Sequence, residues 1–284
     1  MRPPVCRCLP RSRRSIACVL LAAIAGAPAA GGPLPTVASV NLCADQHVLA
    51  LADPEQIVTV SWLAADPEES LFAAQARQHR LNYGTAEELL GLNPDVVIAG
   101  TYTSPFTRAL LQRLGQRVVE LAPEASVTDI VRNVRLVAAE VGQVARGEQL
   151  VAKLHAELET LAAHRPAIAY AAVIVRPGGF TVGDGSLANE MLELAGLRNV
   201  AAEQGLDRWG SLSMEALLRS APELIVLTDY RGSQPSLANA VLEHPALVRL
   251  RASSRMVTVP AAFWSCGLPR SIESIALLQG AFAP

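Results

Sequence analysis

The sequence predicts an α/β fold of two related lobes, and an internal repeat is the strongest observation behind that prediction. Residues 87–102 return as residues 215–230 without a gap. In both copies a glutamate opens a short helix with a Leu-Leu pair, a proline breaks the helix, and a buried-type strand runs out to a tyrosine. Two such segments in register indicate two lobes with equivalent surface glutamates, Glu87 and Glu215, and a ligand site in the space between the lobes.

The composition is typical of a folded protein of this size. The 284 residues suffice for two domains, and contents of 51% hydrophobic and 18% charged residues favour a packed core over disorder. The net charge of −2 gives no sign of the basic face that nucleic-acid binding requires. We therefore expect no nucleic-acid partner.

Strands and helices also alternate along the chain, which is typical of parallel sheets with crossover helices. In the first half, short apolar runs predict strands at residues 36–40, 57–60, 96–99 and 118–121. Residues 41–45 are expected to form a turn into a helix over 46–51. The strand at 57–60 ends at Ser61 and Trp62.

Two amphipathic helices are expected in the middle of the chain, over residues 128–140 and 144–163. The second helix has leucines on one face, namely Leu150, Leu154, Leu158 and Leu161. The second half then repeats the βα order, with strands at 171–175, 224–228 and 256–259 and a helix at 187–195. Since no Ser/Gly-rich linker separates the halves, a long helix is expected to join them stiffly.

The N-terminus has the features of an export signal. Five arginines and no acidic residue occur in residues 1–30, and an apolar run at 16–25 leads to Ala27-Pro28-Ala29. We expect cleavage near residues 29–30 and a periplasmic location; the alternative is an uncleaved membrane anchor, for which the apolar run is short. Cleavage would leave Cys43 and Cys266 as the cysteines of the mature chain.

The ordered set of these segments resembles the class III periplasmic binding proteins of ABC importers, which carry vitamin B12, iron-siderophores and haem. The resemblance covers about residues 36–280. Its markers are Ser39-Val40-Asn41, Glu87 with Leu92-x-Pro94-Asp95-Val96-Val97-Ile98, Glu215 with Pro222-Glu223-Leu224-Ile225-Val226, and Pro269-Arg270-Ser271 before a last helix.

The resemblance implies two Rossmann-like lobes joined by a long rigid helix, with the ligand cleft between the lobes. The implied divisions are a signal peptide at 1–30, an N-terminal lobe at 36–142, a linking helix at 143–165 and a C-terminal lobe at 166–284. It further implies a monomer without enzymatic activity or a cofactor, whose partner is an ABC transporter permease in the inner membrane. In that family each lobe offers one glutamate to arginines of the permease, and Glu87 and Glu215 occupy these positions. Alternatively, both are acids favoured at helix N-termini.

Aromatic residues make up only 4% of the chain, yet several follow predicted strands, where ligands meet open α/β sheets. The expected ligand contacts among them are Trp62, Tyr102, Phe180, Trp209, Phe263 and Trp264. Trp62, Phe180 and Trp209 match cleft positions of the vitamin B12-binding member of the family. Broad rings suit a flat macrocycle or aromatic chelate, whereas ordinary core or rim positions are the alternative.

By the same resemblance, Cys43 and Cys266 match cleft positions on opposite lobes. The two sulfurs could form a disulfide, remain inert thiols, or ligate a metal or metallated ligand. His47, four residues after Cys43, could join such a metal site or be a structural histidine. A thiol-based metal-binding or redox protein that uses both cysteines is therefore an alternative of another class.

The resemblance favours a periplasmic substrate-binding component that delivers a metal chelate, with cobalamin or another corrinoid first. A ferric siderophore or haem is the alternative within the family. Anionic iron chelates usually need several arginines, and only Arg176, Arg208 and Arg270 are placed near the cleft. The sequence has no G-x-S-x-G motif, phosphate loop or zinc-type histidine pair, which disfavours an enzyme.

Overall fold

The computed structural model describes residues 32–228, 245–251 and 253–282. From Leu34 onward these residues form one compact unit. The expected signal peptide and its cleavage site lie outside the described residues, as does Tyr230 at the end of the second repeat. Among the described helices, none has the length and apolar content needed to cross a bilayer.

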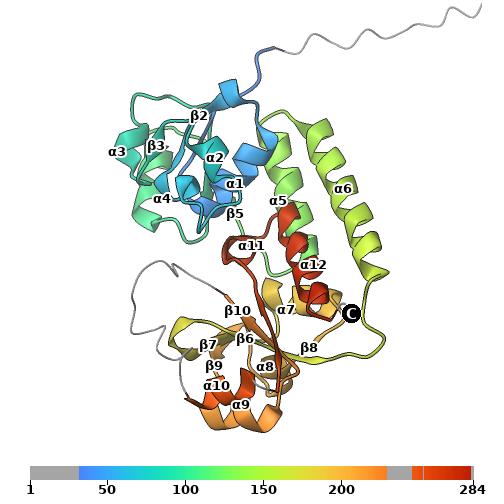
Figure 1. Ribbon diagram of the computed structural model, residues 1–284. Helices are drawn as coiled ribbons and strands as arrows, with labels where there is room; N and C mark the ends of the chain where they lie inside the picture. The colour runs from blue at the N-terminus through green and yellow to red at the C-terminus, as the bar shows by residue number, and fades with distance from the viewer. Residues whose placement is uncertain (1–31, 229–244, 252, 283–284) are drawn as a thin grey trace, which may run out of the picture. The chain divides into compact units, whose positions relative to one another are not determined.

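The first lobe is built on a parallel sheet in the order β3-β2-β1-β4-β5 (Figure 1). Its strands are β1 Val37–Ser39, β2 Ile57–Ser61, β3 Leu81–Asn82, β4 Val96–Gly100 and β5 Val118–Leu121. Its helices are α1 Leu42–Leu51, α2 Ala73–Ala76, α3 Ala86–Leu89 and α4 Pro105–Arg113, with 3₁₀ turns η1 Pro54–Gln56 and η2 Trp62–Ala65. The four predicted strands are confirmed, whereas the two-residue β3 was too short to be predicted.

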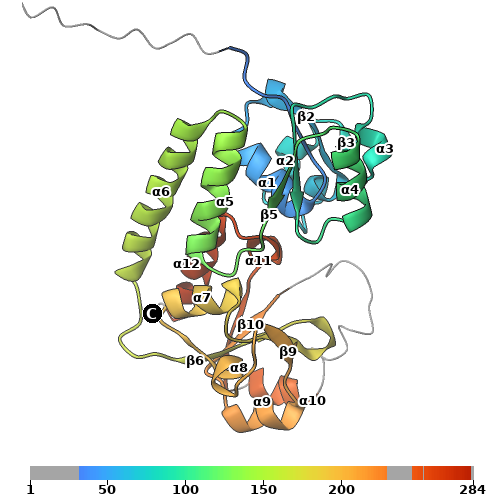
Figure 2. The ribbon, with the colours of Figure 1, turned by 180° about the vertical axis from the view of Figure 1, so that it is seen from behind.

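Two antiparallel helices, α5 Val127–Glu140 and α6 Val144–Ala162, follow the first sheet and lie side by side in both ribbon views (Figures 1 and 2). Ser126 caps α5, since its hydroxyl accepts a hydrogen bond from the Asp129 amide. The helices approach closely at Gly147, where a Cβ atom would lie 2.5 Å from the Cβ of Ala138. The two predicted helices are therefore confirmed within a residue or two at each end.

The second lobe has a parallel sheet in the order β11-β10-β6-β8, and β7 and β9 form a separate antiparallel pair. Its strands are β6 Ala171–Val175, β7 Phe180–Val182, β8 Arg198–Asn199, β9 Trp209–Ser211, β10 Leu224–Leu227 and β11 Arg255–Thr258. Its helices are α7 Leu187–Leu194, α8 Val200–Glu203, α9 Met214–Ser220, α10 Pro245–Arg251, α11 Ala262–Ser265 and α12 Glu273–Gly280, with 3₁₀ turns η3 Pro177–Gly179 and η5 Pro269–Ile272. The antiparallel pair was not predicted, and it changes the surroundings of two expected ligand contacts.

Apolar residues alternate between the two faces of each central strand, as a strand covered on both sides requires. In β4, Val96 and Ile98 face one core while Val97 and Ala99 face another. In β10, Leu224 and Val226 face the same shared core, which also includes side chains of α5, α6, α7 and α12. One hydrophobic core therefore joins both sheets through the helical layer, and each sheet has a second, smaller core on its other face.

The two repeated segments have the same local fold in both lobes. The residues before the two prolines, Asn93 and Ala221, both have left-handed backbones, with φ of 44° and 42°. The acids that follow the prolines play the same role: the Asp95 carboxylate accepts from Thr36 N at 2.8 Å, and the Glu223 carboxylate accepts from Ala171 N at 2.9 Å. In each lobe the acid thus ties the central strand to the start of its neighbour.

The first helix differs from its prediction. Residues 41–45 were expected to form a turn, but α1 already begins at Leu42. Asn41 is the N-cap, because its side-chain oxygen accepts hydrogen bonds from the amides of Cys43 and Ala44, each at 3.1 Å. Cys43 therefore lies in the first turn of a helix whose N-terminus begins at the end of β1.

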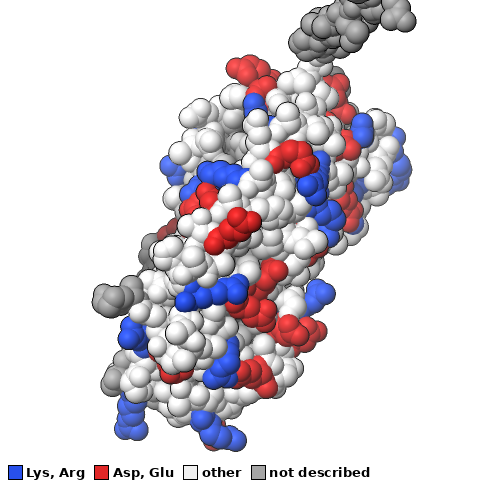
Figure 3. Space-filling model, turned by 90° about the vertical axis from the view of Figure 1, so that its right-hand side faces the viewer, with Lys and Arg blue, Asp and Glu red and all other residues white. Residues whose placement is uncertain are grey.

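Charged side chains are interspersed on the face that Figure 3 shows. Ion pairs join charged side chains of neighbouring elements, such as Arg135 with Glu148 at 2.8 Å and Arg117 with Glu140 at 2.7 Å. Exposed pairs of this kind contribute roughly 0–1 kcal/mol each. The stability of the fold therefore comes mainly from the shared core.

Candidate functional site: a cleft with a disulfide in its wall

A cleft with a cavity volume of about 220 Å³ is lined by residues from three parts of the chain. The first lobe contributes residues that follow β1, β4 and β5, and the second lobe contributes β7, β9 and the start of α7. The third part is the segment of residues 264–267, which the chain reaches after β11. The cleft thus lies at the carboxyl ends of the first lobe's strands, where ligands bind in open α/β sheets.

The wall from the first lobe begins at Asn41 and Gly100. A Cβ atom at Gly100 would lie 3.0 Å from the Asn41 side-chain oxygen, so a larger residue would disturb the cap of α1. Thr101 and Tyr102 follow directly after β4 and line the cleft, and Tyr102 is 71% exposed. An aromatic ring is therefore available to a ligand on this wall.

Glu124 is a lining residue that the sequence analysis did not identify. Its carboxylate is hydrogen-bonded to the buried His47, with Nε2 and Oε1 3.0 Å apart, and also accepts from the side-chain Nδ2 of Asn133. The backbone at Gly267 passes so close that a Cβ atom there would lie 2.2 Å from the Cβ of Glu124. No motif surrounds Glu124, so only the folded structure could bring it to the cleft.

His47 is held by this contact as a structural histidine. It is fully buried, and its Nε2 pairs with Glu124 in the middle of the β5–α5 connection. Among the described residues, no group of three or more His, Cys, Asp or Glu side chains is arranged to hold a metal ion. These contacts therefore favour a structural role for His47 over a role as a metal ligand.

The wall from the second lobe is the antiparallel pair β7–β9, which carries Phe180 and Trp209. Trp209 pairs with Val182, and Phe180 pairs with Ser211, so both rings stand on the same face of the two strands. A second hollow of about 420 Å³ adjoins the cleft and shares Arg176, Val182, Trp209 and Ser265 with it. Trp209 was expected just before the repeated helix, and it does precede α9, within an antiparallel pair that was not predicted.

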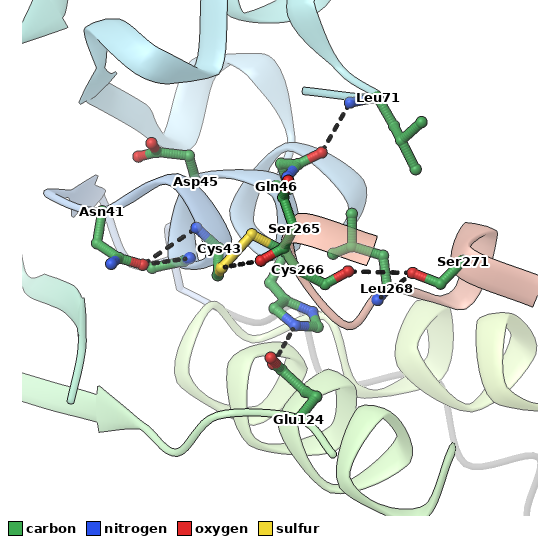
Figure 4. The surroundings of a disulfide bond; sticks show 12 residues. Asn41, Cys43, Asp45, Gln46, Leu71, Glu124, Ser265, Cys266, Leu268 and Ser271 are labelled. Carbon is green, nitrogen blue, oxygen red and sulfur yellow. Dashed lines mark hydrogen bonds and ion pairs between the residues drawn. A yellow bond between two sulfur atoms is a disulfide. The ribbon is translucent and has the colours of Figure 1, made fainter. Parts of the chain in front are cut away.

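Cys43 and Cys266 form a disulfide, which is one of the three states that the sequence left open (Figure 4). Their Cα atoms are 5.2 Å apart, although the residues are separated by 223 positions. Both cysteines line the cleft, and the bond joins the first turn of α1 to the segment after α11. Because each sulfur is bonded to the other, neither is a thiolate that could ligate a metal in this state.

The other predicted aromatic contacts divide into two groups. Tyr102, Trp209 and Trp264 line the cleft, and Phe180 lines the adjoining hollow. Trp264 is only 7% exposed and its Nε1 donates to the Ser274 hydroxyl at 2.9 Å, so most of its ring belongs to the core.

Trp62 and Phe263 are absent from the lining of both hollows. Phe263 packs against the shared core instead. Trp62 stands at the end of β2 next to Tyr83, with ring centroids 6.3 Å apart, and the two rings form an exposed pair on the rim of the first lobe.

Two of the three arginines placed near the cleft line it. Arg176 and Arg208 come from the second lobe. Arg270 instead pairs with Glu273 at 2.7 Å and donates to the carbonyl of Leu71 at 3.0 Å. The cationic part of the lining is therefore on the second lobe, whereas Glu124 is on the first.

Asp45 fixes the start of α1 beneath the cleft. It is fully buried and accepts hydrogen bonds from the amide of Ser61, at 2.9 Å, and from the Ser61 hydroxyl. Burial raises the pKa of Asp45 from 3.8 to about 6, while the hydrogen bonds from Ser61 oppose that change. The helix that carries Cys43 is thus tied to β2 by a carboxyl group whose charge depends on pH.

The repeated glutamates lie in equivalent, exposed positions. Glu87 is in the first turn of α3 and Glu215 is in the first turn of α9. Both are exposed, and neither lines the cleft. Both also satisfy the preference for acids at helix N-termini, so position alone fits either of the two roles expected for them.

Comparisons with known proteins agree with this fold. A family model for periplasmic binding proteins matches residues 37–254. A cobalamin-binding protein of Halobacterium salinarum is 22% identical over 257 residues, which cover 87% of this chain and 69% of that protein. An uncharacterized ABC transporter substrate-binding lipoprotein of Bacillus subtilis is 24% identical over 153 residues. That match covers 50% of this chain and 48% of the relative, which is about half of each.

A solved structure has the same arrangement of lobes. The periplasmic heme-binding protein from Roseiflexus sp. RS-1, in its apo form, superposes with a TM-score of 0.74 at 22% identity, over 87% of this chain and 97% of that one. At this identity the likeness establishes the fold and not the ligand. Because the family model spans well over half of the chain and the two-lobed α/β fold agrees with it, this protein belongs to the class III periplasmic binding proteins.

Proposed function

We propose that the protein is the binding component of an ABC importer and carries a metal chelate to a membrane permease. The observation that carries this proposal is the cleft, where exposed rings stand on both walls, Tyr102 on one lobe and Trp209 on the other. Two such walls suit a flat, largely apolar guest, since large rings offer broad contact at low side-chain entropy. A binding role, and not catalysis, is what this family and this lining support.

Cobalamin or another corrinoid is the ligand that we propose first. The Halobacterium relative is a cobalamin-binding protein, and the match with it covers 87% of this chain. Haem is the second candidate, supported by the heme-binding neighbour of similar fold. A ferric siderophore with several negative charges is disfavoured, because the cleft has two arginines, Arg176 and Arg208, and also the acid Glu124.

Quenching of tryptophan emission tests the ligand class. Trp209 and Trp264 both line the cleft, so a coloured chelate bound there will lie close to two of the three tryptophans. We expect cyanocobalamin to quench emission with a dissociation constant at or below micromolar, or about 8 kcal/mol of binding free energy. Tight binding of haemin or of a ferric siderophore without any response to cyanocobalamin would replace the first candidate by one of the others.

We also propose that Glu87 and Glu215 dock the two lobes on the permease. Both carboxylates are exposed, and the repeat places them at equivalent positions of the two lobes. Charge reversal at either residue is expected to lower uptake of the ligand while its affinity stays unchanged, because an arginine would face the cations of the partner. Glu159→Arg, an exposed reversal on α6, is the matched control and should leave uptake unaffected.

We also propose that the protein is exported to the periplasm, that residues 1–30 are cleaved, and that the mature protein acts as a monomer. Its lobes would be residues 36–142 and 166–284, joined by residues 143–165. Mass spectrometry of the protein purified from the periplasmic fraction tests the processing. A mature N-terminus near residue 30 would support it, whereas an intact leader in a membrane fraction would favour the anchor.

A further inference from the structure

Arg208 has an unusual backbone for its residue type. Its φ is 51°, and only two other described residues that are not glycine, Asn93 and Ala221, have a positive φ. Asn93 and Ala221 lie in equivalent turns directly before the repeated prolines, so the local fold of the repeat explains their positive φ. Arg208 has no counterpart of this kind, and it is the one of the three that lines the cleft.

Neighbouring backbone holds Arg208 in this conformation from both sides. Its amide donates to the carbonyl of Asp184 at 2.6 Å, and its carbonyl accepts from the amide of Gly183 at 2.9 Å. Gly183 has to be a glycine, because a Cβ atom there would lie 1.8 Å from the carbonyl oxygen of Leu206. A strained residue that its surroundings impose in this way is a candidate for function, since a relaxed alternative such as glycine would be more stable.

The stem of Arg208 passes beside the turn that precedes α7. A Cβ atom at Gly185 would be 3.8 Å from the Cγ of Arg208, which is an ordinary van der Waals contact. Trp209 follows directly and lines the same wall. A cation and an exposed ring therefore stand next to each other at the cleft.

No ion pair joins the Arg208 guanidinium to an acid in the described part of the chain. The acid that lines the opposite wall, Glu124, is already hydrogen-bonded to His47 and Asn133. The guanidinium is thus a strong donor whose fork is available to a guest in the cleft. Such a fork binds a carboxylate or phosphate through two parallel hydrogen bonds.

We infer that Arg208 determines specificity by binding an anionic group, a carboxylate or a phosphate, at the edge of a ligand whose apolar face lies on Trp209. This inference rests on the proposed function, because it names the chemistry of the ligand in that same cleft. Arg208, with its left-handed backbone, and Trp209 line the cleft from adjacent positions of the chain, so one guest can contact both.

Calorimetry with two pairs of chelates tests the inference. Haemin has two carboxylates and its dimethyl ester has none; cyanocobalamin has a phosphodiester, and dicyanocobinamide lacks it. We call the member that carries a carboxylate or phosphodiester group the anionic chelate of its pair, and the wild type is expected to prefer it. Arg208→Gln should weaken binding of that member by about 10-fold to 100-fold, the range for a hydrogen bond to a charged group, and change affinity for the member without that group by less than about twofold.

Two further variants separate binding from folding. Arg208→Gly should raise the melting temperature, because glycine adopts a positive φ without strain, and it should lose the preference for the anionic chelate. Ala221→Gly relieves the same kind of strain outside the cleft, so it should raise the melting temperature with the preference intact. Arg219→Gln removes an exposed arginine of α9 and should change neither quantity.

The outcomes distinguish the inference from the function on which it rests. If the wild type binds a chelate pair and Arg208→Gln keeps the full preference, the inference is wrong while the proposed function stands. If the wild type binds none of the four chelates, the proposed function fails and takes the inference with it. Loss of preference within the haemin pair identifies a carboxylate as the partner of Arg208, and loss within the cobalamin pair identifies a phosphate.

Discussion

Removing the Cys43–Cys266 disulfide should destabilise the whole fold. The bond closes a loop across 223 positions of sequence, so it strongly restricts the unfolded chain. The loop-entropy relation gives about 5 kcal/mol at 25 °C for a loop of this size, and measured losses from native disulfides are about 2–5 kcal/mol. We expect a loss of about 3–5 kcal/mol for the double variant Cys43→Ala, Cys266→Ala, which leaves no unpaired thiol.

Urea unfolding followed by circular dichroism measures this loss, and the wild type treated with dithiothreitol is the matched comparison. The unfolding free energies of the reduced wild type and of the double variant should agree, because both proteins lack the bond. Since only the variant has altered side chains, this comparison separates the effect of the bond from that of the alanines. A second signal is local: Trp264, two residues before Cys266, is 7% exposed, and freeing its segment should shift its emission to longer wavelength. An unfolding free energy within about 1 kcal/mol of the oxidised wild type would refute the argument from chain entropy.

Three further predictions concern the core, the helical layer and the cleft. The raised pKa of Asp45 favours the folded state below about pH 4, and this contribution is lost as the pH rises through about 6. Asp45→Asn should therefore gain about 3 kcal/mol of unfolding free energy relative to the wild type between pH 4 and pH 7, measured by urea titration at each pH; no gain would contradict full burial of the charge. Gly147→Ala should lower the unfolding free energy by about 1–3 kcal/mol in the same assay, because its Cβ would lie 2.5 Å from that of Ala138, although alanine has the better helix propensity. Gly280→Ala is the control and should not destabilise the fold, because the space around Gly280 is open. Trp209→Ala should weaken ligand binding by about 1–3 kcal/mol in calorimetry, and an unchanged affinity would remove this ring from the site.

The repeat allowed much of the fold to be predicted from the sequence, because its signals are local. The turn and strand at Pro94, and again at Pro222, are indicated by neighbouring residues alone: a proline, an acid and an apolar run with β-branched residues. The turn before α1 was predicted wrongly for a related reason. Asn41 was assigned to a turn, and its cap of α1 begins the helix four residues before the expected start.

The site was less predictable than the fold, because its residues come together only through tertiary contacts. Glu124 belongs to no motif, and the close passage of Gly267 that helps position it comes from the far end of the sequence. The pair β7–β9 was missed because each strand is three residues long, too short for a periodic pattern. Without that pair, the sequence could place Phe180 and Trp209 near a ligand but could not show that their rings share a face.

The position of Cys266 also sets an order for assembly. Residue 266 follows every strand of both described sheets, so its sulfur reaches Cys43 only after the chain has been synthesised through both lobes. The bond therefore cannot form while residue 266 is still missing from the growing chain. Any strand pairing that occurs before that point proceeds without the covalent link between α1 and the segment after α11.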